Sequence, residues 1–529
     1  MKAVKSFSKN FIPLLFYCIF SGLIAVSLGQ DANFDLRNYH YNNPFAFLNN
    51  KTDSNFFTSQ IQTYFNPLVN LLPYLLSTVF SGTQTAFILG FIQGLNAFLI
   101  FRIVLLVLGN YSQKLKIFLA GAVALISLTG PGNISELGTV FADNFNSIFI
   151  LLSLYFLIIF IRNDFLPKKK VFFSGFFLAI GLGIKLTAYI YIIPFALAVI
   201  FLILFIKNKR DFILILFLGF LLGFLISYAW WGFHVYQTIG NPVFPFYNGV
   251  FHSPWLVDNN FFDARFYPKT LAQQIFYPFY FIELNTLISE VPFRDLRFAA
   301  VYFLVFILFS KFLIKKLFER KKLLQFKENL QKNPDIVIQL FLLIFFICAY
   351  INWQLVFSIH RYLIPIELLT GLIALILLKN LFKNKKFLSL IFIFLTGLLI
   401  FWSKPMDWGR VEFTEKYIQL FDIDNEKYSD SVIFLASQLP ISYIIPEFPA
   451  NNTFYLYYYQ HFFNQDNIYR EVNIRLKNSQ DIQKFLIYNK TLLKQSLQIE
   501  MSKYNLQISN ECSEFSTNLK DYLYICKLY

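Results

Sequence analysis

Long apolar runs constrain this chain more than any other feature of its sequence. Segments such as "SIFILLSLYFLIIFI" (147–161) and "DFILILFLGFLLGFLISYAWW" (211–231) recur along most of the chain and carry almost no charge. A helix needs ~20 apolar residues to cross ~30 Å of hydrocarbon. Hydrophobic residues make up 56% of the chain and charged residues 15%, whereas soluble domains have about 25% charged residues. The sequence therefore predicts an all-α polytopic membrane protein.

The apolar runs predict about eleven transmembrane helices, each close to the length that a bilayer requires. The first run follows three lysines, as in a signal peptide, but it lacks a small-residue cleavage site and many further spans follow it. We therefore expect a retained first helix. The expected spans cover approximately 11–28, 85–108, 116–130, 143–161, 171–186, 188–206, 212–230, 297–315, 335–352, 361–378 and 386–402.

The positions of the basic residues predict the topology. The net charge is +15, and half of the 46 Lys and Arg residues lie in alternate connections, all on one side of the expected bundle. The positive-inside rule makes that side, with the N-terminus, cytoplasmic. The excess charge thus indicates topology and gives no support to a nucleic-acid partner. The apolar segment 64–80, interrupted by Pro67 and Pro73, would break this alternation. We interpret it as an amphipathic or re-entrant outer element, with a twelfth span as the alternative.

The same pattern divides the chain into two domains. Residues 1–402 are expected to form the transmembrane domain, with outer loops 29–64, 130–142 and 231–296. Residues 403–529 are polar and are expected to form a small extracytoplasmic α/β domain, with strands in "DSVIFLAS" and "DYLYICKLY" and a helix near 480–505. Cys512 and Cys526 in this tail either form a disulfide in an oxidising compartment or remain two unpaired buried thiols.

The ionisable residues at the outer ends of the spans are the candidate functional groups, because a charged side chain within a span costs ~2.5–3.5 kcal/mol. Asp35 stands at the start of "FDLRNYHYNNPFAFL", a stretch that predicts a short amphipathic helix at the interface. The carboxylate either caps that helix or serves as a general base with Arg37 and His40 beside it. Position alone favours neither interpretation.

Two further acids stand in the next outer segment, "TGPGNISELGTVFADNFNS". Glu136 and Asp143 are seven residues apart, so they would share a face of a continuous helix. Asp143 opens the next span, where an acid can also cap the helix and interact favourably with its dipole. Together with Asp35, these acids could bind a divalent cation or orient an acceptor hydroxyl, although the sequence has no tight metal-ligand spacing.

Two cations lie on the outer side, against the charge pattern. Lys185 stands in "LAIGLGIKLTAYIYIIP", where snorkelling of a lone lysine is the simpler explanation. Arg361, flanked by His360 and Tyr362, opens the span in "NWQLVFSIHRYLIPIE". An arginine there suits a bidentate grip on a phosphate. Acids that activate a hydroxyl and bases that neutralise a phosphate fit transfer from a phosphate leaving group.

The order of these segments resembles the GT-C superfamily of membrane glycosyltransferases, including its protein O-mannosyltransferase and aminoarabinose transferase branches. The resemblance rests on "FDLRNYH" after the first span, "ELGTVFADN" in the second outer loop, "GIKLTAYIYIIP" between two spans and "RYLIP" at 361–365. The blocks "DLRNYHYNNPFAFL" and "GNPVFPFYNGVFHSPW" also look like a bacterial subgroup of these membrane proteins. The resemblance to the GT-C superfamily covers roughly residues 10–400.

For this superfamily the resemblance implies a cell-envelope enzyme of the bacterial inner membrane, acting on the non-cytoplasmic face. Its donor would be a polyprenyl-phosphate-linked sugar, and its acceptor a glycan, a lipid or a protein. Carried over, Asp35 would be the catalytic base, Arg361 and Lys185 would bind the lipid phosphate, and Glu136 or Asp143 would support the acceptor or a metal. The outer loops differ from the aminoarabinose branch, so neither that sugar nor a metal is carried over.

Two other functions stay open. An O-antigen-type polymerase or ligase would use Arg and His residues of the large outer loop, such as His252 and Arg265. A lipid or solute transporter would show internal repeats and charges at the bilayer midplane, whereas the costly charges here stand at one boundary. The sequence contains no GxGxxG after a strand, no P-loop, no HExxH and no paired CxxC.

Overall fold

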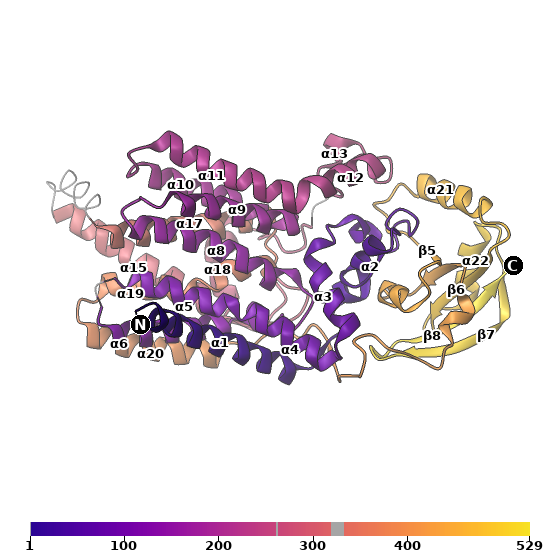
Figure 1. Ribbon diagram of the computed structural model, residues 1–529, viewed down its shortest axis with the longest axis horizontal. Helices are drawn as coiled ribbons and strands as arrows, with labels where there is room; N and C mark the ends of the chain where they lie inside the picture. Colours follow the sequence, from indigo (N-terminus) through magenta and orange to yellow (C-terminus); the bar gives the residue numbers. More distant parts are fainter. Residues whose placement is uncertain (1, 110, 261–262, 319–332) are drawn as a thin grey trace.

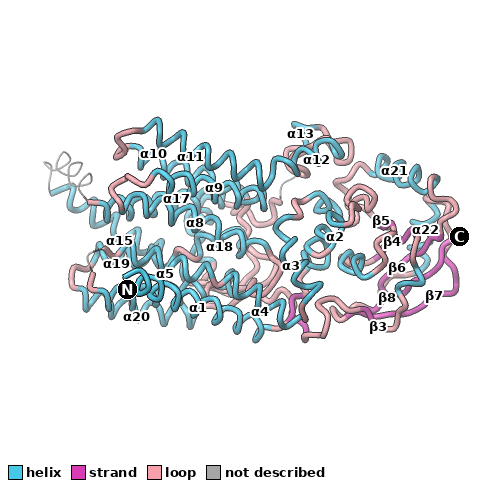
Figure 2. The backbone as a smooth tube through the Cα atoms, viewed as in Figure 1, coloured by secondary structure: helices cyan, strands magenta, loops and turns pink. Residues whose placement is uncertain are grey.

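The chain folds into an elongated helical bundle with a sheet domain at one end (Figures 1 and 2). The computed structural model describes residues 2–529 except 110, 261–262 and 319–332, and of 2–10 and 312–318 only the backbone. The predicted classes of both parts are confirmed: the protein is mostly helical and ends in a sheet domain. Five of the basic residues counted in the alternate connections, Arg320, Lys321, Lys322, Lys327 and Lys332, lie outside the described residues.

The bundle is built from helices that follow the apolar runs closely, because each run buries its side chains in the bundle or presents them to lipid. The helices are α1 (Lys2–Leu28), α4 (Gly82–Gln93), α5 (Leu95–Val107), α6 (Gln113–Leu128), α8 (Ala142–Arg162), α9 (Lys168–Ile184), α10 (Ile192–Ile203), α11 (Lys209–Phe224), α15 (Arg297–Phe318), α17 (Pro334–Val356), α18 (Ile364–Glu367), α19 (Thr370–Leu381) and α20 (Lys385–Trp402).

Seven segments of the described chain are long and apolar enough to cross a membrane: Phe11–Leu28, Gly82–Val107, Ala142–Arg162, Leu186–Ile203, Lys209–Ile239, Pro334–Val356 and Lys385–Trp402. An eighth arises if His360–Glu367 and Thr370–Leu381, bent by 49°, count as one span. The expected number of about eleven is not confirmed. The other three expected spans are helical, but α6 and α9 have only 16 and 17 residues, rises of about 24 and 26 Å. The side chains of α15 are described only as far as Lys311.

The segment 64–80 forms α3 (Leu68–Val79), a 12-residue helix with Pro73 inside it. Its rise of about 18 Å is too short for a bilayer crossing. Figure 1 shows α3 between the bundle and the sheet domain. Together with η1 (Leu36–His40), α2 (Asn42–Leu48) and η2 (Gln60–Tyr64), α3 forms an outer layer. The remaining short helices are α7 (Pro131–Ser135), η3 (Leu186–Tyr191), η4 (Leu225–Ala229), α12 (Trp230–Ile239), α13 (Asn248–Phe251), α14 (Leu271–Tyr280) and η5 (His360–Leu363). Of these, η3, η4, α12 and η5 lie within the candidate spans.

Glycines bring two membrane helices into close contact. A side chain at Gly175 of α9 would meet the Leu216 carbonyl oxygen of α11, and one at Gly219 would meet the carbonyl oxygen of Phe172. Small residues allow such backbone approach in lipid, where packing takes over from the hydrophobic effect. The outward face of α11 exposes large apolar side chains, as a lipid-facing surface does: Leu214, Phe217, Leu218, Leu221, Leu222.

The sheet domain contains six strands in the order β3-β7-β8-β6-β4-β5. The strands are β3 (Leu420–Phe421), β4 (Ser431–Ala436), β5 (Thr453–Leu456), β6 (Gln483–Asn489), β7 (Ile508–Thr517) and β8 (Tyr522–Leu528), with η6 (Asn425–Tyr428), η7 (Ser442–Glu447), α21 (Gln465–Lys477) and α22 (Lys494–Ser502). β4 pairs in parallel with β5 and β6, and the other pairs are antiparallel. The expected strands at "DSVIFLAS" and "DYLYICKLY" are β4 and β8. The helix expected over 480–505 is wrong for its first part, because β6 buries Phe485–Tyr488 between β4 and β8.

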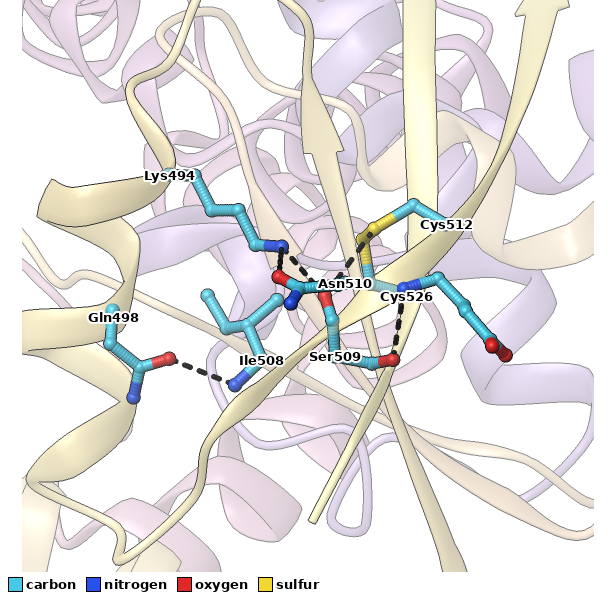
Figure 3. The surroundings of a disulfide bond; sticks show 8 residues. Lys494, Gln498, Ile508, Ser509, Asn510, Cys512 and Cys526 are labelled. Atoms are coloured by element: carbon cyan, nitrogen blue, oxygen red, sulfur yellow. Dashed lines mark hydrogen bonds between the residues drawn. A yellow bond between two sulfur atoms is a disulfide. The ribbon is translucent and has the colours of Figure 1, made fainter.

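Cys512 and Cys526 form a disulfide, which decides between the two possibilities for the tail cysteines. The two residues are directly opposite each other on the antiparallel strands β7 and β8. Figure 3 shows the bond beside a bulged turn of β7, where Lys494 Nζ donates to the carbonyl oxygen of Ser509 at 2.7 Å and Ile508 N donates to Gln498 Oε1 at 2.8 Å. The disulfide and these contacts fix α22 and the edge of the sheet to one another.

The tail is fastened to the outer layer by a two-stranded ladder and by two arginines. β1 (Gln30–Asp31), just after α1, pairs with β2 (Arg410–Val411), just after α20. Arg410 also donates to the carbonyl oxygens of Gly29 at 3.1 Å and Ser135 at 2.8 Å. Arg37 forms an ion pair with Asp521 of the sheet domain. These contacts place the sheet domain over the ends of the bundle helices.

Candidate functional site

A cavity of about 1000 Å³ lies where one end of the bundle meets the outer layer and the sheet domain. Its wall includes Ala142 at the start of α8, Ile184 at the end of α9, Leu186 at the start of η3 and Phe357 just after α17. The same end carries the candidate acids and cations, whereas the basic connections lie at the other end. The ionisable side chains and histidines in the wall are Asp35, His40, Lys185, Asp263, Arg265, Glu290, Arg361, Asp407 and His461.

Asp35 lies in this wall and does not cap a helix. It stands at the start of η1 in helical backbone conformation, and its side chain makes no capping hydrogen bond. Arg361 Nη1 instead donates to Asp35 Oδ2 at 2.7 Å, and Tyr39 Oη lies 3.5 Å from the same oxygen. Burial is the largest single effect and favours a raised pKa for this carboxyl. The charge of Arg361, the nearby His40, the hydrogen bond from Arg361 and the charge of Lys185 together outweigh it and hold the pKa of Asp35 below its ordinary value. Asp35 is therefore an ionised carboxylate, ready to accept a proton.

His40 presents a free nitrogen to Asp35. Asn70 donates its amide hydrogen to the Val140 carbonyl oxygen at 3.2 Å, so the amide oxygen of Asn70 is left as an acceptor. His40 Nδ1, 2.7 Å from that oxygen, must then be the donor. His40 Nε2 lies 3.9 Å from Asp35 Oδ2 and has no hydrogen-bond partner in the described structure. Burial lowers the pKa of His40 to about 4, against the opposing effect of Asp35, so the ring is neutral near pH 7.

Arg361 is enclosed by aromatic rings and acids. Its guanidinium carbon lies 4.8 Å from the Phe141 ring centre and 5.4 Å from that of Trp408. Nη2 lies 3.9 Å from Glu290 Oε1, so Arg361 links Asp35 and Glu290. Two buried donors here, Arg361 Nε and Trp408 Nε1, lack a hydrogen-bond partner within the described part of the chain. Unused buried donors beside a cation are suited to an anion.

Lys185 does not snorkel freely to the surface but forms an ion pair with Asp143. α9 ends at Ile184, and Lys185 follows in extended backbone conformation. Its ammonium lies 2.6 Å from Asp143 Oδ2 and 5.4 Å from the ring centre of Tyr362. Lys185 and Tyr362 both line the cavity. The structure therefore brings Asp35, His40, Lys185, Arg361 and Tyr362 together, with Asp143 directly behind Lys185.

Glu136 has a structural position behind the cavity. The chain between Glu136 and Asp143 is not one helix, because α7 ends at Ser135 and Gly138 has a φ of +71°. The expectation that the two acids share a helical face is therefore wrong. Glu136 Oε2 accepts a hydrogen bond from Asn144 N at 3.1 Å. It thus pairs with a backbone N–H group in the first turn of α8 that has no partner within the helix. Burial, then the nearby Asp143, raises the pKa of Glu136 well above its ordinary value.

Arg37 and His360 do not line the cavity. Arg37 points to the sheet domain, where it pairs with Asp521 and donates to Leu519 O at 2.6 Å. His360 is fully buried, with Nε2 3.5 Å from Glu367 Oε2 and its ring against Phe293. Both residues were predicted as site residues because they neighbour Asp35 and Arg361 in the sequence. Their side chains, however, point away from the cavity.

The acids expected as cation ligands do not form a ligand shell, since Asp35 and Asp143 each pair with a cationic side chain. In the described part of the chain, only Asp295, His360 and Glu367 bring three metal-ligating atoms within 4.8 Å of one another. Arg297 Nη1 lies 2.7 Å from Asp295, and Glu367 accepts the backbone N–H groups of Gly132 and Asn133 at 3.0 Å each. The guanidinium already supplies the positive charge of this group, which fits a structural network.

The sequence pattern missed several residues of the wall. Glu290 lies 3.8 Å from Arg265 Nη2 as well as near Arg361, and Arg265 is bound by Asp263 at 2.7 Å. Asp407 and Trp408, just after α20, also line the cavity. An acid beside an aromatic residue at the outer end of a span was the available signal for them. Of the other loop residues, His252 is largely exposed and pairs with Asp258 at 2.8 Å.

Comparisons of the sequence with protein-family models and with curated proteins give no match. The chemical capacity of the cavity therefore rests on its own side chains. It combines an ionised carboxylate, a neutral imidazole with a free nitrogen, and cationic and N–H donors that can hold an anion.

Proposed function

We propose that this protein is a glycosyltransferase of the GT-C type, which moves a sugar from a polyprenyl-phosphate-linked donor to an acceptor hydroxyl. The observation that carries the proposal is the ion pair of Asp35 with Arg361 in the wall of the cavity. The two residues supply the two functions that such a transfer needs, a base for the hydroxyl and a cation for the phosphate.

The reaction follows from these positions. The acceptor oxygen attacks the anomeric carbon of the donor sugar, and its proton passes to Asp35. The bond between the anomeric carbon and the phosphate oxygen breaks, and its electron pair stays on the polyprenyl phosphate. Arg361 and Lys185 balance the charge of the phosphate, and the free N–H groups of Arg361 and Trp408 donate to it. Phosphate binding to Arg361 weakens its hold on Asp35, which raises the basicity of the carboxylate.

The proposal includes an orientation in the bacterial inner membrane. Arg162 ends α8, Lys168 begins α9 and Lys385 begins α20, all at the end of the bundle away from the cavity. The positive-inside rule makes that end cytoplasmic, and the cavity and residues 403–529 then lie outside. The Cys512–Cys526 disulfide agrees with an oxidising compartment for the tail. In this arrangement residues 1–402 form a GT-C-like domain of about eleven spans, counting the bent pair as one span and adding α6, α9 and α15 to the seven long segments.

The deciding experiment replaces Asp35 with Asn in the full-length protein reconstituted in lipid nanodiscs. The substrate is a fluorescent polyprenyl-phosphate-linked sugar, and release of polyprenyl phosphate and formation of the glycosylated acceptor are both measured. We expect Asp35→Asn to lose at least about 100-fold in transfer rate. Asp263→Asn, a carboxylate of the same wall that pairs with Arg265, is the matched control. A correctly inserted Asp35→Asn protein with full transfer activity would disprove this base.

A polymerase or ligase is the second candidate, because Arg265 of the large loop also lines the cavity. In that case Arg265→Met or His252→Asn would abolish activity while Asp35→Asn would not. Movement of labelled substrate without any covalent change would instead indicate a transporter.

A further inference from the structure

A second pocket, of about 180 Å³, lies next to the cavity at the edge of the sheet domain. Its wall includes Ser437–Ser442, which follows β4, and Tyr457, Tyr458 and Gln460, which follow β5. β4 and β5 are parallel neighbours, so both segments leave the sheet at the same edge. The crevice outside the carboxyl ends of parallel strands is the usual ligand site of such sheets.

The pocket is polar but uncharged. None of its described lining residues is Asp, Glu, Lys, Arg or His. It combines amides and hydroxyls with aromatic rings: Asn38, Gln60, Gln62, Gln438, Gln460, Thr58, Ser437, Ser442, Phe34, Tyr457 and Tyr458. Amides and hydroxyls donate and accept hydrogen bonds together, as neighbouring hydroxyls of a sugar require. A charged ligand would be buried here without a counter-charge, which is costly.

Two polar atoms of the wall have no partner within the protein. Ser437 Oγ and Gln460 Oε1 are buried and make no hydrogen bond in the described structure. Buried polar atoms are nearly always paired. Side chains elsewhere in the wall are held in place: Gln60 Nε2 donates to Tyr458 O at 3.2 Å, and Asn38 Nδ2 donates to Gln62 Oε1 at 3.2 Å. Both residues line the pocket, so the two unpaired atoms favour a polar ligand in an otherwise ordered pocket.

The pocket and the cavity share part of their walls. Phe34, Gln62 and Gln460 line both, and Phe34 directly precedes Asp35. The pocket therefore adjoins the cavity at Phe34, next to the residue that carries the carboxylate. Leu439 and Tyr458, also in the wall, are 53% and 46% exposed, so this part of the wall reaches the surface of the protein.

We propose that this pocket binds the acceptor and that the acceptor is an uncharged saccharide. The inference rests on the proposed transferase function and adds the acceptor class, which the catalytic residues do not define. One sugar unit occupies the pocket between Tyr458 and the Ser437–Gln460 pair, and the unit that accepts the transferred sugar reaches Asp35 beyond Phe34.

Saturation-transfer NMR on the full-length protein in nanodiscs tests binding directly, without turnover. The probes are the N-acetylglucosamine and mannose trisaccharides, trigalacturonic acid and a peptide containing Ser and Thr. We expect saturation transfer to the neutral trisaccharides, reduced at least about threefold in Tyr458→Ala and in Ser437→Val. Tyr522→Ala, an exposed tyrosine of β8 that does not line the pocket, is the matched control and should bind as the unchanged protein does.

Each other result overturns the inference. Preference for the acid trisaccharide or the peptide, the absence of binding to the neutral probes, or binding that is unaffected by Tyr458→Ala would each do so. Asp35→Asn separates this inference from the proposed function, because it should bind the trisaccharides normally while losing transfer. Normal transfer by Asp35→Asn together with pocket-dependent saccharide binding would reject the base and retain the saccharide site.

Discussion

The Asp35 carboxylate and the Arg361 guanidinium lie 2.7 Å apart, although 326 residues separate them in the chain. Their side chains are only 15% and 13% exposed. A buried ion pair often adds little stability compared with apolar side chains of similar volume. A catalytic role therefore explains the position of this ion pair in the wall of a large cavity better than a contribution to stability does. Variants of Arg361 distinguish these two roles most directly.

Replacing Arg361 with Met should lower kcat/KM for the lipid-linked donor by about 10²–10³-fold, since such losses follow the removal of a single preorganised donor. Arg361→Lys should recover only part of the loss, because an ammonium cannot present two parallel N–H groups. Both variants are measured in the nanodisc transfer assay.

Arg265→Met is the control for this series. Arg265 lines the same cavity, but its side chain is 65% exposed and is already engaged by Asp263. We expect less than about a tenfold change in that variant, in keeping with a more solvated charge. An equal loss in Arg265→Met and Arg361→Met would contradict the assignment of the phosphate to Arg361.

The ion pair between Lys185 and Asp143 predicts non-additive stability changes. Their side chains are 13% and 5% exposed, so removing either partner leaves a buried charge, at a cost of about 3–5 kcal/mol. The double variant Lys185→Met/Asp143→Asn leaves no uncompensated charge and should unfold at a higher temperature than either single variant. Thermal midpoints from tryptophan fluorescence measure this cycle, and simple additivity of the two shifts would show that the residues are not coupled.

The sequence predicts the helices of the bundle well, because burial in lipid depends on local composition. The spans expected at 143–161 and 335–352 are observed as Ala142–Arg162 and Pro334–Val356. It also selects Asp35, Lys185 and Arg361 together, since charges at the outer boundary are rare and costly. The span number of about eleven is not confirmed, because bends and short helices such as α18 depend on packing that composition does not record.

Side-chain direction and long-range pairing could not be predicted. Arg37 stands two residues from Asp35, yet it pairs with Asp521, 484 residues away, and no local pattern indicates that contact. Similarly, the local sequence around 483–489 favoured a helix, but pairing with β4 and β8 makes it the strand β6. Asp407 and Trp408 enter the cavity only because β2 returns the tail to the end of α1.

The disulfide predicts the compartment of the tail. In a variant with Cys18 and Cys348 replaced by Ser, only Cys512 and Cys526 remain. After denaturation, a maleimide-polyethylene glycol reagent should add nothing without reductant and two groups after reduction. Labelling without reductant would place the tail in a reducing compartment. Replacing both cysteines with Ser should destabilise the sheet domain by about 3 kcal/mol, as expected for a loop of this length.

His40 predicts the acid sensitivity of the fold. In the folded protein burial lowers the pKa of His40 from 6.5 to about 4. Below pH 6.5 the unfolded chain therefore binds a proton that the folded chain does not, and stability falls as the pH falls towards 4. The full effect is about 3 kcal/mol at pH 4.

His40→Asn keeps a donor for Asn70 but cannot titrate, so its thermal midpoint should decline less steeply than that of the unchanged protein between pH 6.5 and 4. Parallel curves for His40→Asn and the unchanged protein would mean that the pKa of His40 is the same in the folded and the unfolded chain, and the lowering of this pKa by burial would have to be abandoned.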